Sequence, residues 1–250
     1  MTADVVDDQS VGTLRGKIVL AAADVLEKEG LNALSIRTVA ARAGVFPPTI
    51  FRLFKDKEGL LEAVGEHGFD TYLQAKSRLP QSNDPVADLR LAWDLHIEFG
   101  LLQPAYYSLI FGQSGTGRLS QAGGKAVAEL QRMVTRVAAV GRLRMSVERA
   151  TVIMHAGGVG VVTTMISTPP EARDPEAAQV TREIILDAIT VPLAAGPVGT
   201  DRGVGMAGSA MALRAVLAEQ GGLPLSPGEK LLLLELLNRL ADVQHGTSGI

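Results

Sequence analysis

The stretch from Ser35 to Lys57 places two short helical patterns on either side of a tight turn, and it constrains the fold more than any other segment. Apolar residues recur three and four positions apart in both patterns, as they do on one face of a helix. Gly44 stands between the patterns and can adopt the positive φ that a two-helix corner needs. Pro47 and Pro48 fit the first turn of the second helix, where backbone N–H groups lack intrahelical partners. The stretch therefore predicts a helix-turn-helix.

Neighbouring segments complete a compact helical head. A longer helix is predicted at 13–29, because its apolar residues share one face, and Gly30 supplies the stop. Ser35 is the expected N-cap of the next helix, and Asp56 is expected to cap a further helix at 57–78.

The charge distribution separates this head from the remainder of the chain. Residues 13–60 hold eight basic and five acidic side chains, a net charge of +3, whereas the whole chain carries −3. One basic module in a mildly acidic protein fits a DNA duplex bound at one end.

These residues resemble the amino-terminal domain of the TetR (tetracycline-repressor-like) family of bacterial transcription regulators. The resemblance runs from Lys17 to about Glu66, and its most specific elements are Ala43-Gly44-Val45, Thr49-Ile50-Phe51 and Lys57-Glu58. It implies an all-helical homodimer with a carboxy-terminal ligand-binding and dimerisation domain. It also implies a DNA-binding protein that represses from a near-palindromic operator until a small molecule binds. Because the chain has no cysteine and its histidines are scattered, we further expect a cytoplasmic protein that is not an enzyme and holds no metal or cofactor.

The resemblance also assigns the DNA contacts. Arg37 and Thr49 match positions that reach base edges, and Lys57 and Phe51 match phosphate contacts, although the family usually has Tyr where Phe51 stands. With few polar readers in the recognition helix, we expect apolar contacts to thymine methyl groups and a contact from Arg37 to guanine. The expected DNA-binding residues are Ser35, Arg37, Thr38, Phe46, Pro47, Pro48, Thr49, Phe51, Arg52 and Lys57.

Each of these residues also has a purely structural interpretation. Phe51 could belong to the core, as could Phe54, for which burial is the favoured interpretation. Lys57 could be an ordinary solvated lysine, and Arg37 a surface arginine.

Glycine and proline clusters divide the chain into four parts. We expect a disordered tail at 1–12, the helix-turn-helix domain at 13–56, a ligand-binding and dimerisation domain at 57–195, and an extra helical hairpin at 196–250. Beyond the head, helices are predicted near 57–78, 85–101, 104–111, 124–140, 146–167, 174–193, 206–220 and 227–243.

One apolar segment could be mistaken for a membrane span. Residues 150–170 contain no Asp, Glu, Lys or Arg and are long enough to cross a bilayer. Polar residues within the segment, and the lack of a basic flank, favour a buried interface helix instead. The resemblance implies that helices near 146–167 and 174–193 pair with their copies in a four-helix dimer interface.

The few aromatic residues cluster on helices that the resemblance places beside a ligand cavity. An apolar pocket with a few polar groups would accept a neutral or mostly apolar effector, although such clusters are usually plain core. The candidate ligand-binding residues are Trp93, His96, Phe99, Tyr106, Tyr107, Phe111 and His155.

Two other function classes compete with a regulator. The first is an enzyme, but the chain has no cysteine, which excludes thiol catalysis and zinc sites built on cysteine. Residues 112–116 differ by one residue from the nucleophile-elbow motif of hydrolases, and they follow no predicted strand. A helical protein-interaction module could use the carboxy-terminal hairpin.

Overall fold

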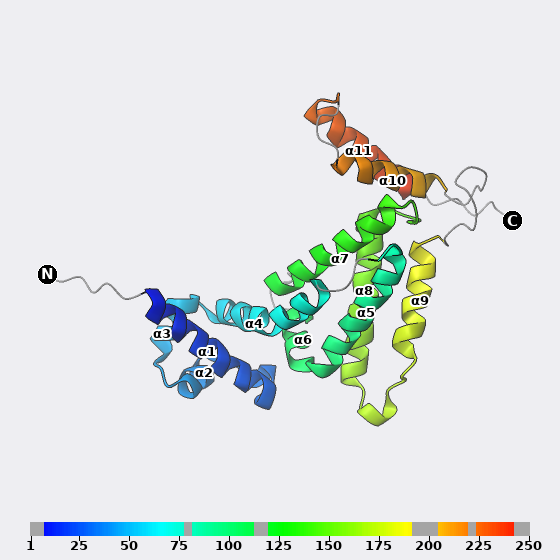
Figure 1. Cartoon of the computed structure of the whole chain (residues 1–250). Helices are drawn as coiled ribbons and strands as arrows, with labels where there is room; N and C mark the ends of the chain where they lie inside the picture. Colours follow the sequence, from blue (N-terminus) through cyan, green and yellow to red (C-terminus); the bar gives the residue numbers. More distant parts are fainter. Residues whose placement is uncertain (1–7, 78–81, 113–119, 192–204, 220–223, 243–250) are drawn as a thin grey trace. The chain divides into compact units, whose positions relative to one another are not determined.

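The computed structural model describes residues 8–77, 82–112, 120–191, 205–219 and 224–242, which are almost wholly helical (Figure 1). Within these ranges no strand occurs, and an isolated bridge joins Leu143 to Thr190. The expected all-α fold is confirmed. The α-helices are α1 (Asp8–Glu29), α2 (Ile36–Ala43), α3 (Pro47–Phe54), α4 (Lys57–Ser77), α5 (Pro85–Leu102), α6 (Pro104–Phe111), α7 (Gln121–Ala139), α8 (Val147–Ser167), α9 (Ala177–Ile189), α10 (Met206–Glu219) and α11 (Pro227–Ala241).

The amino-terminal unit comprises Met1–Arg78 and Glu98–Ala126. Its head consists of α1, α2 and α3, whose inward side chains are fully buried, among them Ile18, Leu26 and Ile50. Helix α6 packs against α4 within the same unit and also contacts α1. The head and α6 therefore share one compact unit, although the sequence assigned α6 to a separate ligand-binding domain.

The carboxy-terminal unit comprises Leu79–Ile97 and Val127–Ile250. Helices α8 and α9 pack side by side, and α10 and α11 form the expected hairpin (Figure 1). A buried ion pair supports the bundle: Asp88, 2% exposed, accepts a hydrogen bond from Arg136 at 2.6 Å. Burial opposes ionisation of Asp88, but hydrogen bonds from Ser82 and Arg136 outweigh it and lower the pKa of the carboxyl group.

Three helix starts differ from the sequence prediction by three residues or more, and one of them is α9, which begins at Ala177 instead of 174. Helix α1 begins at Asp8, so residues 8–12, expected in the disordered tail, are helical. Helix α7 begins at Gln121 instead of 124. The Ser120 hydroxyl accepts a hydrogen bond from the Gly123 amide at 3.0 Å, and this N-terminal cap overrides the low helix propensity of the glycines that follow.

The apolar segment predicted at the interface forms α8. By length and composition it is the described helix that could cross a membrane, and 28% of its most apolar window is buried inside the protein; a single helix of this kind is weak evidence for a span. Gly157 and Gly158 of α8 face the chain's own helices, because a Cβ at Gly157 would overlap Ile185 of α9 and one at Gly158 would lie 3.2 Å from the His96 ring. Gly160 is exposed.

Candidate DNA-binding surface and candidate ligand sites

The corner between α2 and α3 is built as the sequence predicts. Ser35 caps α2 by accepting a hydrogen bond from the Thr38 amide at 3.1 Å, and the two hydroxyl oxygens lie 2.8 Å apart. Gly44 ends α2 in the left-handed conformation at φ 69°. The Val45 amide then donates to the Ala40 carbonyl at 3.0 Å, which closes the turn.

Helix α3 starts with the two prolines at its first two positions. Phe46 precedes them in an extended conformation, and the Thr49 amide donates to the Phe46 carbonyl at 2.9 Å. Neither proline has an N–H group, so the first turn leaves fewer donors without a partner. The buried side of α3 consists of Ile50 and Phe54.

The opposite side of α3 is exposed. Phe46 is 82% exposed, the highest value among the large hydrophobic residues described, and Phe51 is 50% exposed. The alternative that Phe51 belongs to the core is wrong, whereas the burial expected for Phe54 is confirmed. Pro47, Pro48 and Arg52 are also exposed, and Thr49 is half-buried.

The basic residues of the head fall into two groups. Arg42 forms ion pairs with Asp24 and Glu29 of α1, and Arg15 lies over the Phe54 ring, 4.9 Å from its centroid. Lys28 also forms an ion pair with Asp24 at 2.5 Å, so these three cations interact with other residues of the head. By contrast, Arg37, Arg52, Lys55 and Lys57 are exposed and form no ion pair with a described carboxylate.

Asp56 sets the start of the helix that leaves the head. Its carboxylate accepts a hydrogen bond from the Gly59 amide at 2.7 Å, so it caps α4 as expected. Lys55, just before it, has a positive φ of 71°, which is uncommon for a residue with a side chain. This backbone conformation turns the chain sharply between α3 and α4 and leaves Lys55 and Lys57 exposed beside the end of the recognition helix.

The candidate ligand residues separate into two groups. In the amino-terminal unit, Phe99, Tyr107 and Phe111 pack with Phe69 and Tyr72 of α4, two residues that sequence reasoning missed. The centroids of the Tyr72 and Phe99 rings are 4.6 Å apart, and those of Tyr107 and Phe111 are 4.7 Å apart. Burial raises the pKa of the Tyr107 hydroxyl, helped by its proximity to Tyr72. Phe69 and Tyr72 are three residues apart on α4 and so share one face, a signal that could have identified them from the sequence.

Tyr106 faces away from that cluster. Its hydroxyl donates to the Glu27 carboxylate of α1 at 3.1 Å, and burial together with this carboxylate raises its pKa to about 12. Its ring lies against Gly68 of α4, where a Cβ would overlap the ring atoms. Tyr106 thus joins three helices of the amino-terminal unit.

The remaining candidates lie in the carboxy-terminal unit. The Trp93 indole N–H donates to the Ala178 carbonyl of α9 at 3.1 Å, and the His96 ring lies against Gly158. His155 is half-buried on α8. These contacts place the Trp93 and His96 side chains between α5, α8 and α9.

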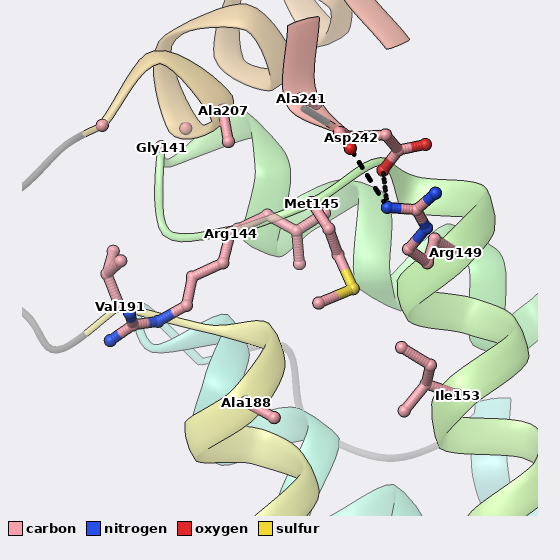
Figure 2. A pocket seen from close by; sticks show the side chains of 13 residues that line it. Gly141, Arg144, Met145, Arg149, Ile153, Ala188, Val191, Ala207, Ala241 and Asp242 are labelled. Atoms are coloured by element: carbon pink, nitrogen blue, oxygen red, sulfur yellow. Dashed lines mark hydrogen bonds and ion pairs between the residues drawn. The ribbon is translucent and has the colours of Figure 1, made fainter. Parts of the chain in front are cut away.

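A cavity of about 520 Å³ lies elsewhere in the same unit, at the base of the α10–α11 hairpin. None of the seven candidate ligand residues lines it. Figure 2 shows apolar side chains, including Met145 and Ile153, below the ion pair between Arg149 and Asp242. The Arg144 side chain extends along its edge, and its Nε donates to the Thr190 carbonyl at 2.5 Å.

Comparison with known proteins places the head in a family. Residues 18–64 match the family model described as bacterial regulatory proteins, tetR family. The chain carries a TetR-family domain. No curated protein sequence matches the chain.

Solved structures share the fold over a larger part of the chain. A protein of unknown function from Rhodococcus sp. RHA1 is 22% identical, with a TM-score of 0.59, over 75% of this chain and 99% of its own. A TetR-family transcriptional regulator from Haemophilus influenzae is 20% identical, with a TM-score of 0.53, over 73% and 99%. The fatty acid degradation regulator FadR from Bacillus halodurans is 15% identical, with a TM-score of 0.54, over 69% and 94%.

These likenesses show a common fold. The neighbours are covered almost completely, whereas a quarter or more of this chain has no counterpart in them.

Proposed function

We propose that this protein is a cytoplasmic, homodimeric transcriptional repressor that leaves a near-palindromic DNA operator when a small, mostly apolar effector binds. The observation that carries the proposal is the exposed edge formed by Phe46, the two prolines and Phe51 at the start of a TetR-family recognition helix. A contiguous group of exposed large apolar side chains is a candidate interaction surface. Contact with thymine methyl groups in the major groove would give these exposed side chains a binding role.

The exposed cations complete this DNA surface. Arg37 of α2 is proposed to read a guanine, and Arg52 and Lys57 to contact the backbone phosphates beside it. Ser35 and Thr38 already bond to each other and to the α2 backbone, so we assign them a capping role before any phosphate contact.

The dimer is proposed to form through α8 and α9. Exposed residues on α9 include Val180 and Ile184, which are 53% and 64% exposed and lie one helical turn apart. Val152 of α8 is 66% exposed. A symmetric pair of chains would cover both faces and hold two recognition helices about one DNA turn apart, roughly 34–36 Å.

Effector binding is proposed to change the distance between the two recognition helices of the dimer. A ligand can shift the equilibrium only by its differential affinity for the two states. Tyr106 supports a route for such coupling, because it bonds to α1 of the DNA-binding head from α6. The aromatic side chains around Tyr107 remain the proposed effector site, and the cavity at the hairpin base is a second place to look.

Selection of genomic fragments on the purified full-length protein tests the function. We expect enrichment of fragments that share an inverted repeat with thymines under the recognition helix. Recovery of fragments without a common repeat, at an affinity no higher than for random DNA, would contradict a sequence-specific regulator. A compound library can then be screened for release of the selected operator.

A further inference from the structure

The hairpin of α10 and α11 leaves an apolar face uncovered. Leu232, Leu236 and Leu240 follow one another at four-residue intervals on α11 and are 41–56% exposed, and Leu231 is 70% exposed. The two helices otherwise pack mainly on each other, with Leu237 on the buried side. A contiguous row of exposed leucines of this kind marks an interaction surface.

Polar contacts attach the hairpin to the first turn of α8. The Asp242 carboxylate accepts hydrogen bonds from the Ser146 amide and hydroxyl at 2.9 and 2.8 Å. Arg214 of α10 forms an ion pair with Glu148 at 2.7 Å. These bonds fix the hairpin at the N-terminal end of α8. Glu148 is also the first residue of a row of exposed side chains on that helix.

This row, the α8 stripe, is the exposed face of α8. From Glu148 it continues at four-residue intervals through Val152 and Ala156, both of which are exposed. Residues four apart lie on the same side of a helix. Helix α10 is therefore attached to the very face of α8 that is proposed to meet the partner subunit.

The chemistry of the hairpin favours a like partner. Residues 206–241 carry three basic and three acidic side chains, so the segment has no net charge that would select a nucleic acid or an anionic surface. The α8 stripe contains small side chains that bury little area, and a stable interface needs roughly 800 Å² from each subunit. The leucines of the hairpin supply the apolar area that the stripe lacks.

We propose that the α10–α11 hairpin is a dimerisation arm that packs its leucine face against the partner subunit and extends the α8–α9 interface. The inference rests on the homodimer of the proposed function. Because a two-fold interface is symmetric, each arm contacts the other chain and the added contact area occurs twice.

Site-specific photocrosslinking in the full-length protein tests the arm. Leu236 is replaced by p-benzoylphenylalanine, which captures any neighbouring C–H bond. Ultraviolet irradiation is expected to yield a covalent species of two chains, with the crosslinked peptide coming from a second copy. The same probe at Leu20 of α1, which is 58% exposed, is the matched control and is expected to give no such species.

A second measurement uses a variant in which Leu232, Leu236 and Leu240 are all changed to Gln. We expect its dimer dissociation constant to rise at least tenfold in sedimentation equilibrium, with helical content unchanged. If the unsubstituted dimer binds its operator but position 236 gives no crosslink and the Gln variant dimerises normally, the arm is overturned. If position 236 gives a crosslinked dimer but the protein enriches no DNA fragment, the proposed function is overturned and the dimerisation arm is supported.

Discussion

Individual arginines in this protein have different roles because their surroundings differ. Arg42 and Arg37 belong to the same helix, yet Arg42 is paired with two carboxylates of α1 whereas Arg37 is exposed. The helical spacing of the sequence puts both arginines on the outer side of α2, opposite the buried Val39 and Ala40. It could not tell them apart, because the carboxylates that bind Arg42 approach only after α1 and α2 have packed.

Arg37→Ala is expected to weaken operator binding by about 1–3 kcal/mol and to relax specificity at one base pair. Fluorescence anisotropy with operators substituted at each position measures this. Arg42→Ala is the matched control and should leave base preference unchanged. An equal loss for Arg37→Ala on every sequence would make it a phosphate contact.

Arg136→Ala is expected to lower the free energy of unfolding by about 3 kcal/mol, because it leaves the buried Asp88 carboxylate without its partner. Urea denaturation at neutral pH measures the loss. Arg132→Ala removes an exposed ion pair with Glu129 on the same helix and should change stability by only about 0.5 kcal/mol.

The lowered pKa of Asp88 also predicts a pH dependence. The folded state holds the carboxylate ionised below the ordinary value of 3.8, so its contribution is fully present above that pH. It is lost as pH falls through the lowered folded pKa. An Asp88→Asn variant should be less stable at neutral pH, and its deficit should shrink on acidification; a constant deficit would argue against the ion pair.

At the scale of elements, helix starts were predictable where a capping residue stands in the sequence. Asp56 and Ser226 both cap helices, and α6 begins at Pro104, the first residue of the helix predicted at 104–111. Helix α7 starts earlier than predicted, because its cap depends on Ser120, whose hydroxyl also donates to the Ile110 carbonyl at 2.9 Å. That bond requires the end of α6 to be in place, which no local pattern reveals.

Two glycines on α4 provide an element-scale prediction. Gly68→Ala should lower the free energy of unfolding by about 1–3 kcal/mol, because its methyl group would collide with the Tyr106 ring. Gly65→Ala should be neutral or stabilise by up to about 1 kcal/mol, since its nearest neighbour, Ile110, is 3.7 Å away. Thermal denaturation of both variants gives the comparison; equal effects would mean that the Tyr106 packing is wrong.

At the scale of the molecule, the sequence predicted the head but gave no sign of the cavity at the base of the hairpin. The head is a local motif whose caps, turn and apolar spacing lie within a continuous segment. The cavity in Figure 2 is lined by α8, α9 and the hairpin, so it exists only after segments far apart in the chain dock. The aromatic residues pack into two groups for the same reason, because tertiary contacts decide which side chains meet.

Ile184→Glu is expected to weaken dimerisation by at least tenfold, because a charge would be buried on the α9 face of the proposed interface. Operator affinity should fall with it, since each chain would then present one recognition helix. Mass photometry and anisotropy measure the two effects. Leu91→Glu, at a position 47% exposed on α5, introduces the same charge and should leave the subunits associated.

The prolines at the start of α3 have a consequence for how the protein responds to salt. A recognition helix that begins with two residues lacking amide hydrogens has fewer main-chain groups to offer a phosphate. In the proposed complex, most neutralisation of the duplex must then come from the exposed cationic side chains around the end of this helix, namely Arg52, Lys55 and Lys57. Each such contact releases condensed counterions, so the logarithm of affinity should fall steeply with the logarithm of ionic strength, by about 0.9 per phosphate neutralised.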